Sequence, residues 1–311
     1  MNPLGQKSTT RSDLAVIIPT RNRPDYLLRL IVNLRDLIVK PNLTIVVDSS
    51  DLNMIAELES GVTDIHRILT AQKSAAIQRN IGLDFLLNSS EKKEIRYVSF
   101  LDDDTLIPID YFQSILDRFD YYQDCVGISG IAKTSGEVEK NIQRSQFTDW
   151  IGITGNPGEL TSSAVNISPI GLKETSEVGW LIGCSTWRVE VFNELRFEKD
   201  FFGQSIFEDV IFSARARKFG KLICDPSILL FHNEAIEGRP IRKLHYADWL
   251  NNRFRIFSYD IPNLSRKKFW LLNFLLFINS FLCSFYNLKK REKMKGLALG
   301  WMKLIKSRLK K

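Results

Sequence analysis

The amino-acid sequence predicts an α/β fold with a mainly parallel sheet covered by helices. Short apolar runs alternate with helical patterns through the first half of the chain, and this β-α-β alternation is typical of parallel sheets. Polar residues directly follow several apolar runs, where the ligand-binding edge of such a sheet would lie. The 311 residues are 44% apolar, which is ample for a buried core.

Each element follows from its local pattern. Apolar runs predict strands at 14–18, 43–47, 65–69 and 96–101, and helical spacing predicts helices at 25–39, 51–59 and 74–87. Residues 132–177 have no clear period and predict a loop-rich insertion. Further on, we expect a strand at 179–188, a helix at 207–219, and a short strand at 221–224 that ends at Asp225-Pro226.

Composition and charge limit the classes of protein. The four cysteines are scattered without a CxxC pair, which favours free thiols over a zinc site. The first thirteen residues lack the apolar core of a signal peptide, so we expect a cytoplasmic location. Residues 289–311 hold ten Lys/Arg and one Glu, a net charge of +9 in a chain of +7. A basic tail on a near-neutral body favours an attachment segment, and we expect no nucleic-acid partner.

Three predicted strand ends carry polar residues. They are Pro19 to Arg23, Asp48 to Asp51, and Asp102-Asp103-Asp104. Three adjacent carboxylates repel one another, and burial is disfavoured unless a cation or hydrogen-bond donors neutralise them. Alternate residues of an extended segment share a face, so Asp102 and Asp104 can address one site. Mg²⁺ or Mn²⁺ would suit these oxygen ligands and would also bind phosphate.

These motifs, in this order and spacing, resemble the donor half of a family-2 glycosyltransferase with the GT-A fold. The resemblance covers about residues 13–120 and rests on VIIPTRNRP, IVVDSSD, QKSAAIQRNIGLDFL and VSFLDDDTLIP. It implies a nucleotide-sugar donor (a UDP-, GDP- or dTDP-sugar) and a divalent metal. The donor-site residues that it implies are Pro19, Thr20, Arg21, Asp48, Arg79, Asp102 and Asp103, with Asp104 as the direct metal ligand and Asp102 on the ribose or the metal. From the residues alone, Asp48 could equally form an Asx turn and Arg79 could be a surface charge.

A second signature, Phe207-Glu208-Asp209-Val210, resembles the ED element of the same family. The resemblance implies that Asp209 is the general base and that Glu208 orients the acceptor, although both could be simple helix-start charges. It also implies that His232 binds the metal, where a structural histidine is the alternative. Trp180 could stack on the acceptor sugar or pack in the core.

The C-terminal region predicts attachment to a membrane surface. Residues 269–286 carry no charge, and Leu297, Trp301, Leu304 and Ile305 recur at helical spacing among lysines. This pattern is typical of a basic amphipathic helix on anionic lipid, and a helix packed on the catalytic domain is the alternative. We therefore expect peripheral association with the cytoplasmic face of a membrane.

The sequence thus predicts a GT-A catalytic domain at 1–235, with a donor half at 13–120 and an acceptor half at 121–235, and a helical membrane-associating extension at 236–311. We expect an inverting transfer to a saccharide or lipid-linked hydroxyl in surface polysaccharide or glycolipid assembly. A sugar nucleotidyltransferase is one alternative, but the first strand lacks the Gly-rich loop typical of that class. A non-catalytic sugar- or lipid-binding module is another, which the intact acidic motifs disfavour.

Overall fold

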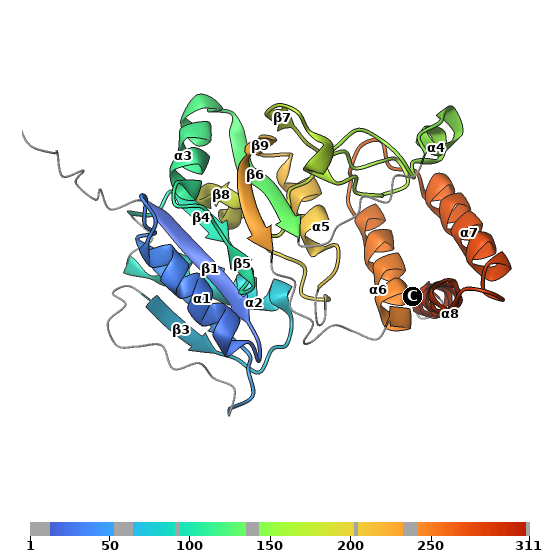
Figure 1. The fold of residues 1–311 in the computed structure, drawn as a ribbon, viewed down its shortest axis with the longest axis horizontal. Coiled ribbons are helices and arrows are strands. Elements are labelled where there is room, and N and C mark those ends of the chain that lie inside the picture. Colours follow the sequence, from blue (N-terminus) through green and yellow to red (C-terminus); the bar gives the residue numbers. More distant parts are fainter. Residues whose placement is uncertain are drawn as a thin grey trace, which may run out of the picture.

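A nine-stranded sheet forms the centre of the molecule. The computed structural model describes residues 13–52, 65–90, 94–134, 143–201, 205–232 and 242–308. The strand order is β3-β2-β1-β4-β8-β6-β9-β5, with β7 beside β9 (Figure 1). The strands are β1 (Leu14–Thr20), β2 (Leu43–Asp48), β3 (Ile65–Leu69), β4 (Tyr97–Phe100), β5 (Thr105–Leu106), β6 (Cys125–Thr134), β7 (Ser176–Glu177), β8 (Thr186–Arg188) and β9 (Lys221–His232). The helices are α1 (Pro24–Arg35), α2 (Ala75–Asn88), α3 (Tyr111–Tyr121), α4 (Gln146–Ile151), α5 (Glu208–Ala216), α6 (Arg242–Arg255), α7 (Arg266–Leu282) and α8 (Leu288–Arg308).

The first four strands are parallel, as predicted. β1 pairs in parallel with both β2 and β4, and β2 pairs in parallel with β3. The strand order therefore reverses between β1 and β4, and ligands of such sheets bind beyond the carboxyl ends of the strands at that point. The predicted helix at 51–59 falls almost entirely outside the described residues.

Helices cover both faces of the sheet. On one face, α1 buries apolar residues at the helical spacing Leu27, Leu30, Ile31 and Leu34, and α3 packs in the same cluster. On the other face, α2 and α5 bury their apolar residues against the opposite side chains of the same strands. This arrangement confirms the predicted α/β layers and leaves the carboxyl edge of the sheet for a site.

The predicted strand at 179–188 is much shorter than expected. Only Thr186–Arg188 pairs in the sheet, as β8. The backbone of Leu181 instead donates to Oγ of Ser213, 3.0 Å away. This segment passes close to the side chain of Arg79. Gly183 permits that approach, since a Cβ there would lie 3.1 Å from Nη2 of Arg79. The residues before β8 therefore line a cavity, as described below, instead of extending the sheet.

The prediction that a strand ends at Asp225-Pro226 was wrong, because β9 continues to His232. β9 runs parallel to β6, and the register shifts from Ser129↔Cys224 to Ile131↔Leu229. Pro226 therefore lies in a bulge, where the absence of its backbone N–H removes no hydrogen bond between the strands. Gly130 permits this bulge, since a Cβ there would lie 2.1 Å from the carbonyl oxygen of Ile228.

The three C-terminal helices form a helical unit with its own apolar cluster of Leu250, Phe269, Leu297 and Leu304. The expected lipid-facing stripe of α8 is therefore mostly turned inward, and of its four residues only Ile305 is exposed. The unit is joined to the sheet domain by Arg253, whose guanidinium donates to the carbonyls of Ser163 (2.8 Å) and Ala164 (3.0 Å). None of the described helices combines the length and apolar character needed to cross a membrane.

Candidate functional site

The site begins where β1 and β2 end, and α2 fixes that edge. The side-chain amide of Gln78 donates to the carbonyls of Thr20 (2.9 Å) and Val47 (2.7 Å). α2 lies close enough to do so because Gly82 faces Ile17, where a Cβ would come within 2.6 Å of the Ile17 side chain. Thr20 and Asp48 are neighbours across the two strands.

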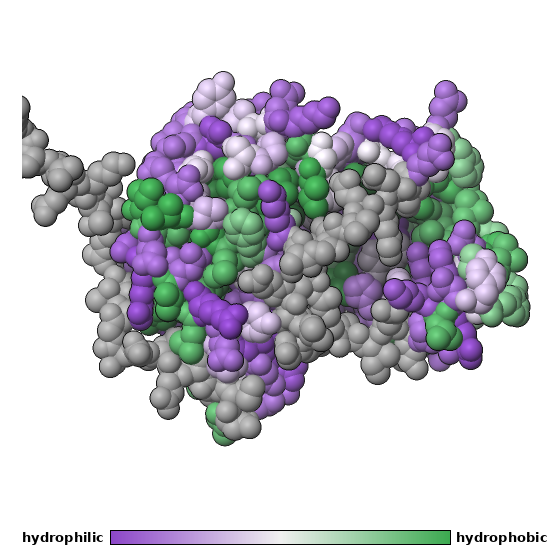
Figure 2. Space-filling view, in the orientation of Figure 1, coloured by the Kyte–Doolittle hydropathy of each residue, from purple (hydrophilic) through white to green (hydrophobic). Residues whose placement is uncertain are grey.

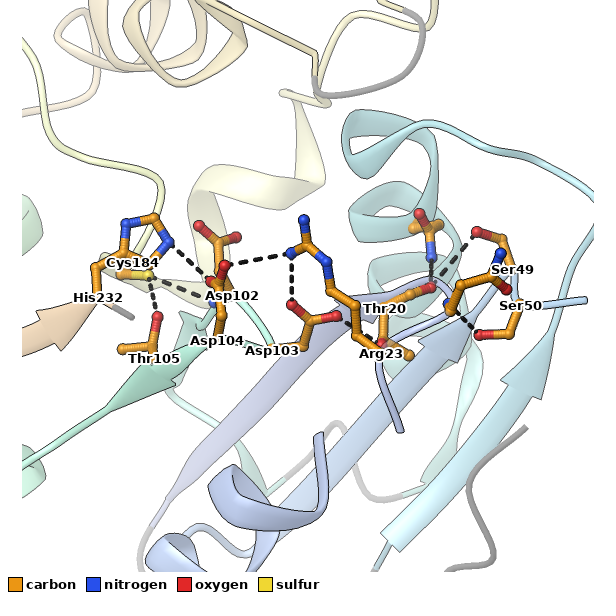
Figure 3. Close-up of polar contacts among 12 residues, drawn as sticks. Thr20, Arg23, Ser49, Ser50, Asp102, Asp103, Asp104, Thr105, Cys184 and His232 are labelled. Carbon is orange, nitrogen blue, oxygen red and sulfur yellow. Dashed lines mark hydrogen bonds and ion pairs between the residues drawn. The ribbon is translucent and has the colours of Figure 1, made fainter. Parts of the chain in front are cut away.

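Within the acidic run after β4, Asp103 turns toward the protein interior. Its carboxylate accepts hydrogen bonds from Oγ1 of Thr20 (2.7 Å) and Nη1 of Arg23 (3.0 Å), as Figure 3 shows. Burial raises the pKa of Asp103 to about 6 despite these donors. These two contacts therefore anchor the acidic run to the end of β1 and to Arg23.

Asp102 and Asp104 lie together with His232, on the other side of the run from Thr20 (Figure 3). One potential ligand atom from each of the three lies within 4.8 Å of the other two. Nε2 of His232 is 2.8 Å from Oδ1 of Asp104. Arg23 also contacts Asp104, at 3.3 Å. Asp102 and Asp104 thus address one site, as expected, but through a turn closed by the Thr105 N–H and the Asp102 carbonyl (3.1 Å) and not through an extended segment.

This trio fits a divalent cation. Two carboxylates and one imidazole are ligands that Mn²⁺ accepts, whereas Mg²⁺ mostly binds oxygen. The carboxylates are close enough to repel each other, and a cation between them would remove that repulsion. Asp104 is buried and Asp102 is partly exposed, so an incoming ligand would meet Asp102 first.

Arg79 links the acidic run to the second signature. Its Nη2 donates to Oδ1 of Asp102 at 2.9 Å, and its Nη1 pairs with Oε1 of Glu208. Arg79 is 2% exposed, so the alternative of a surface helix charge was wrong. One guanidinium therefore holds carboxylates from segments far apart in the sequence in a fixed relation.

Asp209 differs from its neighbour Glu208 in its partners. Oδ1 of Asp209 accepts only the hydrogen bond from the backbone N–H of Val210, 2.8 Å away, among the contacts within the described chain. Burial raises the pKa of Asp209 to about 6.

The backbone is strained where α5 begins. Glu208 and Asp209 are its first two residues, and Phe207 just before them has a φ of 75°. A bulky residue in the left-handed region is strained, and such strain is often found at functional sites.

A cavity of about 520 Å³ brings these groups together. Its lining includes residues of the acidic run, the second signature, the segment before β8 and helix α6. The residues that matter here are Arg79, Asp102, Gly183, Glu208, Asp209, His232 and Trp249. The cavity therefore has one end whose side chains fit a divalent cation, and a carboxylate, Asp209, that can accept a proton.

A larger cavity of about 920 Å³ lies elsewhere, lined by the end of α5 and the segment 259–262. Its charged residues are largely paired, as Lys221 with Asp124 at 2.7 Å. It contains none of the predicted site residues, so we place the functional site in the smaller cavity.

The other predicted residues lie at or near the same edge. Pro19 is buried at the end of β1 and Arg21 is exposed just beyond it. Asp48 is buried and accepts a hydrogen bond from the backbone N–H of Ser50 (2.9 Å), which is the Asx-turn alternative. Trp180 lines the cavity but is 7% exposed, and its indole N–H donates to the carbonyl of Ile167.

Sequence reasoning missed Arg23, Gln78 and Cys184. Gln78 precedes Arg79 within the QRNIG motif, which gave a signal for it. Cys184 accepts the Asp102 N–H at 3.4 Å, and burial raises the pKa of this thiol, so it stays protonated. Arg23 belongs to the polar run Pro19 to Arg23, but its role depends on contacts with the distant acidic run. Nothing in the local sequence marked Cys184.

Comparisons with known proteins agree with this geometry. The sequence matches the family described as "Glycosyl transferase family 2" over residues 15–195. Residues 1–349 of S. aureus TarS, crystallised with UDP-GlcNAc, are similar in structure with a TM-score of 0.51 at 14% identity, over 80% of this chain and 68% of that fragment. GalNAc-T7, crystallised with UDP, GalNAc and Mn²⁺, gives a TM-score of 0.56 at 13% identity, over 80% of this chain and 48% of GalNAc-T7. No curated protein sequence matches the chain.

Proposed function

The chain belongs to glycosyl transferase family 2 and has the GT-A fold, and on this premise we propose that it transfers a sugar from a nucleoside diphosphate sugar to a hydroxyl group with inversion at the anomeric carbon. One observation carries the proposal: Asp102 and His232 line the same cavity as Asp209, and a carboxylate oxygen of Asp104 lies within 4.8 Å of the ligand atoms of both. Together these groups supply a cation site for a diphosphate and a base for an acceptor.

The donor binds along the edge formed by β1, β2 and the acidic run. Asp102, Asp104 and His232 would hold Mn²⁺ or Mg²⁺, and the imidazole favours Mn²⁺. When bound, the cation neutralises the diphosphate and so stabilises it as a leaving group. The nucleoside then lies toward Pro19, Thr20, Arg21 and Asp48, which follow the same strand ends. The similar structures were crystallised with UDP-GlcNAc or with UDP, which supports a nucleotide-sugar as the donor.

Asp209 acts as the general base. Glu208 is already paired with Arg79, whereas Asp209 has no ion pair among the described residues. As the acceptor oxygen bonds to the anomeric carbon, the bond from that carbon to the diphosphate oxygen breaks and the hydroxyl proton passes to Asp209. Oε2 of Glu208 is buried without a hydrogen-bond partner in the described chain, so it can accept from the acceptor and orient it.

The acceptor enters from the side of the helical unit. Trp180 and Trp249 line that part of the cavity, and Trp249 belongs to α6. We assign the catalytic domain to 1–235 and a membrane-associating extension to 236–311. A saccharide or lipid-linked acceptor at the cytoplasmic face of a membrane, in surface polysaccharide or glycolipid assembly, fits this arrangement.

A binding experiment followed by product analysis tests the proposal. Thermal shifts are measured with UDP-, GDP- and dTDP-sugars, each with and without Mn²⁺. A donor at a hundred times its dissociation constant adds ~2.7 kcal/mol of stability, which gives a clear shift. Release of nucleoside diphosphate with an inverted product supports the proposal. Release of pyrophosphate would support a sugar nucleotidyltransferase instead, and the absence of any metal-dependent shift would contradict the donor site.

A further inference from the structure

Helix α7 exposes an apolar stripe to solvent. The residues recur at helical spacing and are between 37% and 60% exposed: Leu271, Phe274, Leu275, Ile278, Phe281 and Leu282. We call this set, with its extensions below, the outer face. Figure 2 shows hydrophobic residues gathered at the side of the molecule where α7 lies in Figure 1. A contiguous exposed apolar patch of this kind marks an interaction site.

α7 places two polar residues on its inner side, although its outer side is apolar. Asn273 and Ser280 face inward and are buried. Asn273 donates to the carbonyl of Phe269 at 2.7 Å and lies 3.5 Å from Nη1 of Arg253. Asn273 and Ser280 are therefore used inside the helical unit, beside the buried Phe269 and Leu272, whereas Asn279 is exposed next to the stripe. Because α7 is apolar on both sides, it presents to its surroundings an apolar stripe that an ordinary surface helix would lack.

Neighbouring segments extend the outer face at both ends. At the start of α7, the exposed rings of Phe147 and Trp150 project from α4, and the Lys268 ammonium lies 5.4 Å from the centre of the Trp150 ring. Beyond its end, Phe285 and Tyr286 are about 80% exposed. Tryptophan and tyrosine at the rim of an apolar surface are typical of the membrane–water interface.

Charge indicates what covers the outer face. Residues 236–311 contain eighteen Lys/Arg and four Asp/Glu, a net charge of +14, which leaves −7 for residues 1–235. Lys267 is exposed just before the stripe, and Lys289 just after it. An anionic surface complements such an apolar face with basic ends. A second copy of this chain would instead bring two strongly basic units together, which is unfavourable.

We propose that the outer face binds the surface of an anionic bilayer, with α7 lying in the plane of the interface. The apolar stripe enters the boundary between headgroups and acyl chains, and the flanking lysines contact the lipid headgroups. The inference rests on the proposed function, since that function supplies the acceptor. Trp249 of α6, in the same helical unit, lines the cavity, so membrane attachment would bring a lipid-linked acceptor toward it. The attachment differs from the one expected from the sequence, since α8 turns its apolar residues inward.

Vesicle flotation of the full chain tests this proposal. Wild type is compared with Phe274→Ser/Ile278→Ser on vesicles of phosphatidylcholine with and without phosphatidylglycerol. The matched control is Val32→Ser/Ile38→Ser, which removes two exposed apolar residues from the region of α1. We expect wild type and control to bind the anionic vesicles, and the α7 variant to bind about ten-fold more weakly or worse. High salt should weaken wild-type binding.

Three results would overturn it. Wild type could fail to float with anionic vesicles, the α7 variant could float as well as the control, or light scattering could show a wild-type dimer that the α7 variant dissociates. Because the substituted residues are exposed, the variant should keep the circular dichroism and the metal-dependent donor shift of wild type. That donor shift is read separately, so failure of membrane binding is distinct from failure of the proposed transferase activity.

Discussion

Nε2 of His232 lies 2.8 Å from Oδ1 of Asp104, although 128 positions separate the two residues. The contact follows from strand pairing, since Thr105 of β5 lies opposite His232 of β9 in an antiparallel ladder. The pairing of β5 with β9 therefore holds the two side chains together. Such support by regular strands is what keeps the ligands of a metal site in place.

We expect Asp104→Ala to abolish metal-dependent donor binding while the fold survives, because it removes the carboxylate shared by His232 and the cation site. His232→Ala should weaken metal affinity less, since two carboxylates remain. Calorimetric titration with Mn²⁺ and UDP measures both effects. Asp110→Ala is the matched control, because Asp110 is an exposed carboxylate just beyond the site. Wild-type metal-dependent binding by Asp104→Ala would remove Asp104 from the metal site.

Asp209→Asn should lower turnover by ~10²–10⁴-fold, the usual cost of losing a general base. The amide has the size of the carboxylate and keeps the contact with Val210, so donor affinity should stay near that of wild type. A coupled assay of nucleoside diphosphate release gives turnover, and calorimetry gives the dissociation constant. Near-normal turnover in this variant would exclude Asp209 from the proton transfer.

The rate should depend on pH through Asp209. Its pKa is raised to about 6 by burial, and the base works only when it is deprotonated. Turnover should therefore be low at acidic pH, rise through about pH 6, and level off above it. The measurement is the pH profile of kcat at saturating donor and metal. A rate that is flat from pH 5 to pH 8 would contradict this assignment.

Replacing Arg79 should destabilise the fold and disturb both halves of the site. Arg79→Met leaves the buried carboxylate of Glu208 without its partner, and breaking a buried pair in this way typically costs ~3–5 kcal/mol. Glu208→Gln in the same chain should restore part of that loss, because the unpaired charge is gone. Urea unfolding of the two single variants and the double variant gives the coupling energy. Fully additive losses would show that the pair carries no such role.

Leu297→Ala should lower the stability of the helical unit, because Leu297 is buried between the C-terminal helices. Such a truncation typically costs ~2–5 kcal/mol, whereas Ile305→Ala, at an exposed position of the same helix, should cost less than ~0.5 kcal/mol. Thermal unfolding compares the two variants. Deletion of 289–311 should for the same reason expose apolar surface on α6 and α7. Equal stability of the two variants would contradict the packing of α8.

The strand ends could be predicted from sequence because each depends on a local pattern. The strands before Thr20, Asp48 and Asp102 are short apolar runs, and the polar residues after them mark the edge of the sheet. The common side of Asp102 and Asp104 comes from a local turn, in which the N–H of Thr105 donates to the carbonyl of Asp102 at 3.1 Å. These features need no knowledge of which distant segments meet.

The features that sequence could not reveal depend on distant partners. Arg79 looks like any helix arginine until α2 is seen to face both Asp102 and Glu208. Asp103 could not be separated from its neighbours until Thr20 and Arg23 were found beside it. The apolar side of α8 predicts burial equally well in lipid or in protein, and tertiary packing decides between them.

The number of residues in the bulge of β9 determines which way the side chain of His232 points. Asp225 to Ile228 lie opposite Gly130 alone, in the bulge of β9, where Ser227 is exposed. Irregular exposed segments usually tolerate insertions and deletions. Here the loss of a single residue would shift the rest of β9 by one position and direct His232 to the opposite face of the sheet. A relative could thus retain every acidic residue and the histidine yet lack the site, so alignments of such chains should be judged by spacing between Cys224 and His232 as well as by the motifs.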